Sequence, residues 1–254
     1  MNLLHAIILG IVEGITEFLP VSSTAHLILT SHALGLGDTE FVKSFEIIIQ
    51  LGAILSVVVL YWRKFLNVEV IKKLVVAFIP TGILGLTLYR VVKGYLLGNL
   101  TVVLLSLAIG GIVLVMLRRF EGDDRDEIDF SEITYRRALL IGLFQSAAMV
   151  PGVSRSAATI VGGSLIGISK RTIVEFSFML AVPTMAAATL LDLLKSHAAI
   201  AGHVPALLTG FVVSFVMAIL AIASFLAFIK RRDFSWFGWY RIVLAAVYFL
   251  VFIR

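Results

Sequence analysis

Residues 13–26 read EGITEFLPVSSTAH and place two carboxylates, a proline, four hydroxyls and a histidine inside an apolar segment, residues 3–34. Glu13, Glu17 and Pro20 divide this segment into halves of about 10–16 residues each, whereas a helix that crosses a bilayer needs about 20. Proline also favours a break in a helix. The stretch therefore predicts a re-entrant pair, in which two short helices enter the membrane and return to the same side.

A second segment, residues 138–168, has the same character. Its midpoint reads PGVSRSAAT (residues 151–159), and VSSTAHLI (21–28) aligns without a gap with VSRSAATI (153–160). In the same register Glu13 corresponds to Gln145. The alignment predicts a second re-entrant pair and an internal repeat.

The composition is typical of a protein embedded in a bilayer. The 254 residues are 60% hydrophobic and 15% charged, with a mean hydropathy of +1.05, and a water-soluble domain of this size would expose that apolar surface. The absence of cysteine excludes disulfides, thiol nucleophiles and thiolate metal sites. We attribute the net charge of +5 to cytoplasmic loops and lipid head groups and expect no nucleic-acid partner. Six runs are long and apolar enough to span: 43–62, 71–90, 97–117, 173–194, 205–229 and 237–253.

These elements predict an all-α integral membrane protein with an inverted-topology repeat of six transmembrane helices and two re-entrant pairs. The first repeat is 1–117, a charged cytoplasmic loop covers 118–137, and the second repeat is 138–254. Three spans per half invert the second half relative to the first. Most Lys and Arg residues, Arg241 among them, then fall on one side, which places both termini outside the cytoplasm.

Small residues suggest where helices pack closely. Gly110-Gly111, Gly162-Gly163 and Ala186-Ala187-Ala188 lie within apolar helical segments. Small side chains let two helix backbones approach each other in a membrane. We expect all three groups at helix–helix contacts.

Glu13 and Glu17 lie four residues apart, so both carboxylates project from one helix face. Two carboxylates in an apolar segment repel each other and lose hydration, so a cation or a proton must compensate. A divalent ion would fit if the ligand is a phosphate, because a metal bridges carboxylate and phosphate oxygens. The alternative is a protonated, hydrogen-bonded pair that only fixes packing.

Ser22, Ser23 and Thr24 open the second short helix, where free N–H groups and the helix dipole favour an anion. Ordinary N-capping is the alternative for these hydroxyls. His26 follows Ser23 by three residues and shares its helix face. With two glutamates and two serines in the same hairpin, His26 is a candidate nucleophile or base, although a lone histidine is more often structural.

Arg155 is an arginine inside an apolar hairpin, with Ser154 and Ser156 beside it at another helix start. A guanidinium there requires an anion, and a phosphate matches its forked donors. A structural ion pair with Glu13 or Glu17 is the alternative. Two opposed helix starts with two carboxylates and a histidine are suited to phosphoryl transfer from a substrate whose tail stays in lipid.

In these two motifs, residues 13–26 and 151–159, the sequence resembles the undecaprenyl-diphosphate phosphatase family, also called bacitracin-resistance proteins. The resemblance extends over essentially the whole chain. It implies hydrolysis of undecaprenyl diphosphate to undecaprenyl phosphate and inorganic phosphate, which recycles the lipid carrier of cell-wall synthesis. It also implies a divalent cation (Mg²⁺ or Ca²⁺), a bacterial inner membrane, a site open to the outer face, and homodimerisation.

The resemblance also assigns roles at the matching positions. Catalysis would fall to His26, Ser23, Glu17 and Glu13, and the two glutamates would also hold the metal. The residues that would bind the diphosphate are Arg155, Ser154, Ser156, Thr159 and Ser22.

A transporter is the competing interpretation. Inverted repeats with broken helices at the membrane midplane are typical of transporters. The chain would then be a lipid-phosphate flippase or an ion-coupled carrier, with the glutamates as proton or ion sites and Arg155 as a substrate anchor. Release of phosphate in detergent micelles distinguishes the two, because an enzyme needs no sealed membrane.

Overall fold

The computed structural model describes residues 1–37, 39–96, 99–119, 130–196 and 203–252, and every regular element in these residues is helical. Residues 120–129 of the charged loop that the sequence predicts lie outside the described residues. The helices before this loop are α1 (Leu3–Thr16), α2 (Ser23–Ala33), α3 (Glu40–Leu60), α4 (Trp62–Phe65), α5 (Val68–Val91) and α6 (Leu100–Leu117). Those after it are α7 (Tyr135–Ser146), α8 (Arg155–Leu165), α9 (Lys170–Ser196), α10 (Val204–Ile229) and α11 (Ser235–Phe252).

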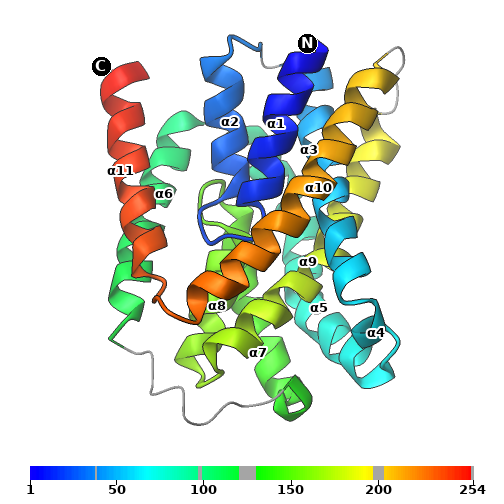
Figure 1. Ribbon diagram of the computed structural model, residues 1–254, viewed down its shortest axis with the longest axis vertical. Helices are drawn as coiled ribbons and strands as arrows, with labels where there is room; N and C mark the ends of the chain where they lie inside the picture. The colour runs from blue at the N-terminus through cyan, green and yellow to red at the C-terminus, as the bar shows by residue number, and fades with distance from the viewer. Residues whose placement is uncertain (38, 97–98, 120–129, 197–202, 253–254) are drawn as a thin grey trace.

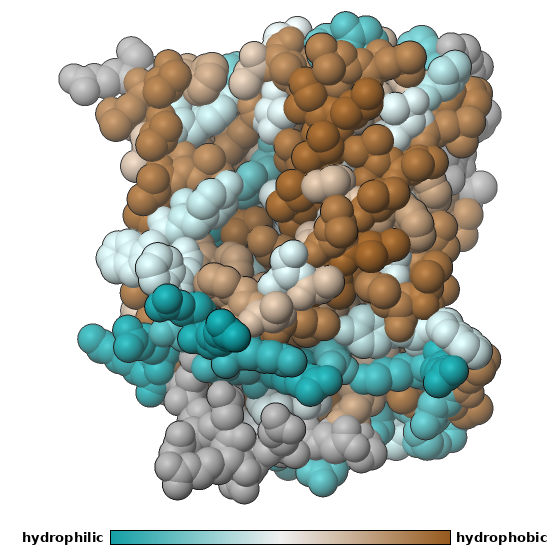
Figure 2. Space-filling model, in the orientation of Figure 1, coloured by the Kyte–Doolittle hydropathy of each residue, from teal (hydrophilic) through white to brown (hydrophobic). Residues whose placement is uncertain are grey.

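Six of these helices are long and apolar enough to cross a membrane: α3, α5, α6, α9, α10 and α11. They match the six predicted spans to within a few residues at each end. Apolar side chains cover much of the face in Figure 2, and hydrophilic side chains gather towards its lower part. An apolar belt of this kind is what the hydrocarbon core of a bilayer requires. The prediction of a multi-pass membrane protein is confirmed.

The four short helices form two pairs. In Figure 1, α1 and α2 occupy the upper half of the molecule, whereas α7 and α8 occupy the lower half. The N- and C-termini both lie at the upper end. The tips of the pairs touch near the middle of the molecule, where Oγ of Ser156 donates a 2.9 Å hydrogen bond to the backbone oxygen of Phe18. Segments that are far apart in the sequence therefore share one central region.

The same backbone feature starts α2 and α8. Ser22 and Ser154 cap these helices with φ angles of 73° and 77°, and they are the non-glycine residues with positive φ in the described chain. Their side-chain oxygens accept hydrogen bonds from the N–H groups of Ala25 (3.4 Å) and Ala157 (3.1 Å). Because positive φ costs a side-chain-bearing residue free energy, such positions persist only where the surroundings enforce them, often at functional sites.

Glycine allows several helices to pack closely. A Cβ atom on Gly14 of α1 would lie 2.5 Å from the backbone oxygen of Ser214 on α10, and one on Gly111 of α6 would lie 2.7 Å from that of Gly238 on α11. Gly162 of α8 likewise packs against Phe144 of α7. The sequence also predicted a helix–helix contact at residues 186–188 of α9. That prediction was wrong, because these residues are exposed. Small size alone therefore does not identify a helix–helix contact.

Candidate active site

A cavity of about 260 Å³ lies where the tips of the two short pairs meet α3, α5 and α9. Small and apolar residues, including Met149, Met185 and Ala188, form part of its lining. Much of the lining is polar and comes from segments of both halves of the chain. Its polar lining residues are Glu17, Ser22, Ser23, Thr24, Gln50, Thr81, Gln145, Ser154, Arg155 and Thr184.

An ion pair within this lining joins the two halves of the chain. Nη2 of Arg155 donates a 2.8 Å hydrogen bond to Oε1 of Glu17, and only 11% and 5% of the two side chains are exposed. Glu17 directly follows α1, and Arg155 is the first residue of α8. Glu17 of the first hairpin and Arg155 of the second therefore meet, as expected from the sequence.

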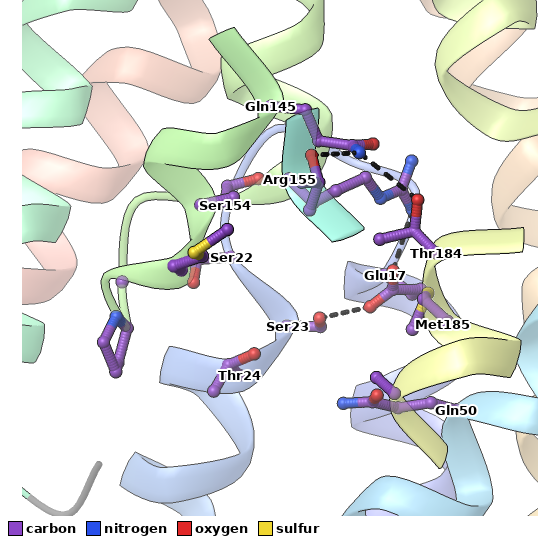
Figure 3. A pocket seen from close by; sticks show the side chains of 16 residues that line it. Glu17, Ser22, Ser23, Thr24, Gln50, Gln145, Ser154, Arg155, Thr184 and Met185 are labelled. Carbon is purple, nitrogen blue, oxygen red and sulfur yellow. Dashed lines mark hydrogen bonds and ion pairs between the residues drawn. The ribbon is translucent and has the colours of Figure 1, made fainter. Parts of the chain in front are cut away.

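The second carboxylate oxygen of Glu17 contacts a hydroxyl. Oγ of Ser23 donates a short hydrogen bond to Oε2 of Glu17, and Figure 3 shows both side chains facing the cavity. A carboxylate that accepts the proton of a hydroxyl can act as its base. Ser23, Glu17 and Arg155 therefore form a continuous line of a hydroxyl, an acceptor and a cation.

Ser177 of α9 fixes the other side of Arg155, and sequence reasoning gave it no role. Nη1 of Arg155 donates to the backbone oxygen of Ser177 at 2.7 Å and to its Oγ at 3.2 Å. Oγ1 of Thr159 donates to the same Oγ at 2.7 Å. Nε of Arg155 is buried without a hydrogen-bond partner in the described structure, so the guanidinium has donor capacity left.

Four predicted site residues do not line the cavity: Glu13, His26, Ser156 and Thr159. Ser156 instead ties the two hairpins together through Phe18, and Thr159 supports Ser177. Both of these hydroxyls stand behind Arg155. Glu13 and His26 also lie outside the lining, and their surroundings differ.

His26 faces the backbone of its own helix and α11. Its Nδ1 lies 2.8 Å from the backbone oxygen of Ser22, and its Nε2 lies 2.7 Å from the hydroxyl of Tyr240. The two rings stack with centroids 5.6 Å apart. Both ring nitrogens are thus engaged, and one of them holds the residue that caps α2. Tyr240 is a further residue that the sequence did not single out.

The residues that carry this geometry match one known family. The model of the family described as "Bacitracin resistance protein BacA" matches residues 6–247 of the chain. The chain belongs to this BacA family.

Relatives of the chain extend over nearly its full length. A protein named undecaprenyl-diphosphatase from Aquifex aeolicus is 50% identical over 251 residues, which cover 98% of each chain. One of the same name from Sulfurihydrogenibium sp. is 50% identical over 252 residues, covering 98% of this chain and 99% of its own. A third, from Persephonella marina, is 51% identical over 254 residues with the same coverage.

Glu13 is the residue of this BacA family member that best fits a metal. Its side chain is fully buried on α1, and neither carboxylate oxygen has a hydrogen-bond partner in the described structure. No group of three or more His, Cys, Asp or Glu residues in the described chain could hold a metal by itself. Mg²⁺, however, commonly uses one or two carboxylates together with substrate phosphates and water. Glu13 has two unpartnered oxygens to offer such an ion, whereas both oxygens of Glu17 accept hydrogen bonds, from Arg155 and Ser23.

Neutral polar groups lie beside the ion pair (Figure 3). Nε2 of Gln145 donates to Oγ1 of Thr81 (2.9 Å) and to Oγ1 of Thr184 (3.2 Å). Each threonine directly follows a proline inside a long helix, Pro80 in α5 and Pro183 in α9. Gln145 occupies the position that aligns with Glu13. The lining of the BacA cavity therefore contains neutral hydrogen-bonding groups as well as an ion pair.

Proposed function

We propose that this chain is an undecaprenyl-diphosphatase, a membrane-embedded hydrolase that converts undecaprenyl diphosphate to undecaprenyl phosphate and inorganic phosphate. The reaction returns the lipid carrier to cell-wall synthesis. The observation that carries the proposal is the contact of Glu17 with Arg155 between two serine-capped helix starts. The names of the relatives support the same activity.

The diphosphate binds against the polar residues of the cavity lining. Arg155 supplies a guanidinium with unused donors, and Ser22 and Ser154 begin helices whose first N–H groups favour anions. Ser156 and Thr159 act from behind by holding Phe18 and Ser177 in place. The apolar residues of the lining suit the first part of the prenyl tail.

Ser23 is the nucleophile that the contacts favour. Its proton passes to Glu17 while Oγ forms a bond to the terminal phosphorus and the bond from phosphorus to the bridging oxygen breaks. Undecaprenyl phosphate leaves, and water then cleaves the phosphoserine to release inorganic phosphate. Arg155 stabilises the charge on the transferred phosphoryl group.

His26 has a different role in this scheme. With Nδ1 at the backbone of Ser22 and Nε2 at Tyr240, it holds the start of α2. A direct attack by His26 on phosphorus is the alternative, and it requires the ring to leave Tyr240. Acid-labile phosphohistidine would identify that route, whereas acid-stable phosphoserine identifies Ser23.

A divalent cation, Mg²⁺ or Ca²⁺, would be held by Glu13 and Glu17, and it would neutralise charge on the diphosphate. The buried, unpartnered oxygens of Glu13 support this assignment. The protein supplies the carboxylates and an apolar surrounding that excludes water, which strengthens the attraction.

The chain is arranged as an inverted repeat, residues 1–117 and 138–254, in the inner membrane of a bacterium. The shared positive-φ serine starts and the placement of the short pairs in opposite halves of the molecule support this. Exposed basic residues such as Lys72, Arg231 and Arg232 favour a cytoplasmic lower end, with both termini and the opening of the cavity outside. Because the chain has no cysteine, single cysteines at the two ends can be labelled with an impermeant maleimide in intact cells to test the orientation.

Phosphate release from undecaprenyl diphosphate in detergent micelles, with and without a chelator, tests the function. We expect release that depends on Glu17 and Arg155 and falls when the cation is removed. A flippase or an ion-coupled carrier would release nothing in micelles, because it changes no bond in its substrate. The mass of the protein–detergent complex tests the homodimer that the family resemblance implies.

A further inference from the structure

Arg241 is a fully buried arginine in the middle of α11. Its guanidinium donates hydrogen bonds to five backbone oxygens, and within the described residues it has no carboxylate partner. A buried charge is costly unless polar atoms surround it. Here the polar atoms that surround the guanidinium are all peptide carbonyl oxygens. Arginine is rare at such a position in an apolar helix.

The five acceptors belong to three separate segments. One is Pro20, in the loop that leads into α2, at 3.3 Å. Two are Gly152 (2.7 Å) and Val153 (3.0 Å), in the loop that leads into α8. The last two are Ser106 and Leu107 of α6, at 3.0 and 3.3 Å. A single side chain therefore joins both loops of the site to one spanning helix.

These loops directly precede the two strained serine starts. Val153 is next to Ser154, and Pro20 stands two residues before Ser22. In a trans peptide the C=O and N–H groups point in opposite directions, so a Val153 oxygen directed at Arg241 turns the N–H of Ser154 away from it. Arg241 itself does not line the cavity. It stands behind both helix starts.

Glycine provides the space for this guanidinium. A Cβ atom on Gly110 of α6 would lie 2.2 Å from Nη2 of Arg241. Only arginine has five donors in one plane, whereas lysine has three on one nitrogen. The surroundings therefore match the shape of a guanidinium as well as its charge.

We propose that Arg241 is a positioning residue that sets the distance and orientation of the two serine-capped helix starts, so that both receive one diphosphate. This inference rests on the proposed phosphatase function. Its positive charge, placed behind both starts, also adds to the attraction for the anion. If Arg241 only anchored α11 to the bundle, its loss would lower stability without altering the relation of α2 to α8.

Turnover of undecaprenyl diphosphate in micelles gives the first test. We expect Arg241→Gly to lower kcat by about 100-fold, the effect of misplacing reacting groups by about 1 Å, and millimolar guanidinium chloride to restore part of it. Arg241→Lys keeps the charge but loses two donors, so kcat should fall by about tenfold. Arg231→Met, an exposed arginine just before α11, is the matched control and should retain full activity without any response to guanidinium.

Distance measurements between spin labels give the second test. Ala33 ends α2 and Leu165 ends α8, and both are exposed, so cysteines there carry labels in a chain without other thiols. The distance distribution should broaden in Arg241→Lys and Arg241→Gly and stay narrow in Arg231→Met. If Arg241→Gly cannot be purified folded, Arg241→Lys carries both tests.

The outcomes separate the two proposals. Near-normal kcat in Arg241→Lys, or an unchanged distance distribution in the inactive variants, would overturn the positioning role. Loss of kcat without any response of Arg241→Gly to guanidinium would do the same. If the unmodified protein releases no phosphate, the proposed function fails, and the spin-label distances still decide whether Arg241 holds the two hairpins.

Discussion

Nη2 of Arg155 lies 2.8 Å from Oε1 of Glu17, so a residue that begins α8 is paired with one that ends α1 across 138 positions of sequence. Both side chains are almost completely buried. We expect a phosphate that enters the cavity to compete with Oε1 of Glu17 for the guanidinium. The other oxygen of the carboxylate, Oε2, already accepts from Ser23 and could take its proton.

Removal of Arg155 should abolish activity and also lower stability. Arg155→Ala leaves Glu17 as a buried, unpaired charge, and such a loss costs about 3–5 kcal/mol. Phosphate release should fall by about 100- to 1000-fold. The double variant Glu17→Gln/Arg155→Ala should regain thermal stability in detergent without regaining activity. Near-normal turnover in Arg155→Ala would contradict the assigned role.

Ser23 should matter far more than its neighbour Thr24, although both line the cavity. Ser23→Ala removes the nucleophile, so we expect turnover to fall by about 1000-fold or more. Thr24→Ala, the matched control, should stay within a few-fold of the unmodified protein. Comparable losses in the two variants would point to a general effect on α2. Trapping of the phosphoenzyme followed by peptide mapping shows which residue carries the phosphate.

The hydroxyl of Tyr240 should contribute modestly to turnover. Tyr240→Phe keeps the ring that stacks on His26 and deletes the 2.7 Å contact to Nε2. Loss of one hydrogen bond of about 1 kcal/mol corresponds to about a fivefold change. If His26 attacks phosphorus directly, the ring must leave Tyr240, and Tyr240→Phe would then be as fast as the unmodified protein or faster. Steady-state kinetics distinguish these results.

Glu13 should control the requirement for a divalent cation. Excess EDTA should suppress phosphate release, and added Mg²⁺ or Ca²⁺ should restore it. In Glu13→Gln the cation concentration for half-maximal activity should rise by about 10- to 100-fold. Gln145→Glu restores the aligned acidic residue in the other hairpin and should not compensate. An unchanged cation dependence in Glu13→Gln would remove this residue from the metal site.

The contact between α1 and α10 should tolerate no added methyl group. Gly14→Ala would place a Cβ atom 2.5 Å from the oxygen of Ser214 and 2.6 Å from Cβ of Met217, so the helices would have to separate. Overpacking of this kind costs about 1–3 kcal/mol. At Gly37 the nearest atom would be 3.8 Å away, and Gly37→Ala should leave the unfolding temperature unchanged. Equal unfolding temperatures for the two variants would contradict the close packing.

Much of the fold could be predicted because length and hydropathy dominate in a bilayer. The six spans follow from apolar runs, and the helix breaks before Ser22 and Ser154 follow from Pro20 and Pro151-Gly152. Pro80 and Pro183 lie inside helices all the same, since neighbouring segments can satisfy the backbone groups that proline frees. The pairing of Glu17 with Arg155 was one of the alternatives that the sequence left open.

Other parts of the site depend on three-dimensional contacts that no local pattern contains. The rotation of α2 turns His26 towards Tyr240 and away from the cavity, and spacing from Ser23 could not reveal this. Nothing in the sequence around Ser177 marks it, because its contacts with Arg155 and Thr159 form only where α8 packs against α9. Arg241 was counted with the cytoplasmic basic residues, and this placement was wrong because its side chain is fully buried. The available signal was its position inside the predicted span 237–253.

The place of Arg241 on α11 has a consequence for biogenesis. The carbonyls that it binds are synthesised long before it, in the loops that precede α2 and α8 and in α6. Before α11 has left the ribosome, the nascent chain already contains both loops. It still lacks Arg241, the side chain that joins them. Hydrolytic competence should therefore arise late, when the final helix enters the bilayer, and ribosome-stalled chains that end before residue 235 should be inactive.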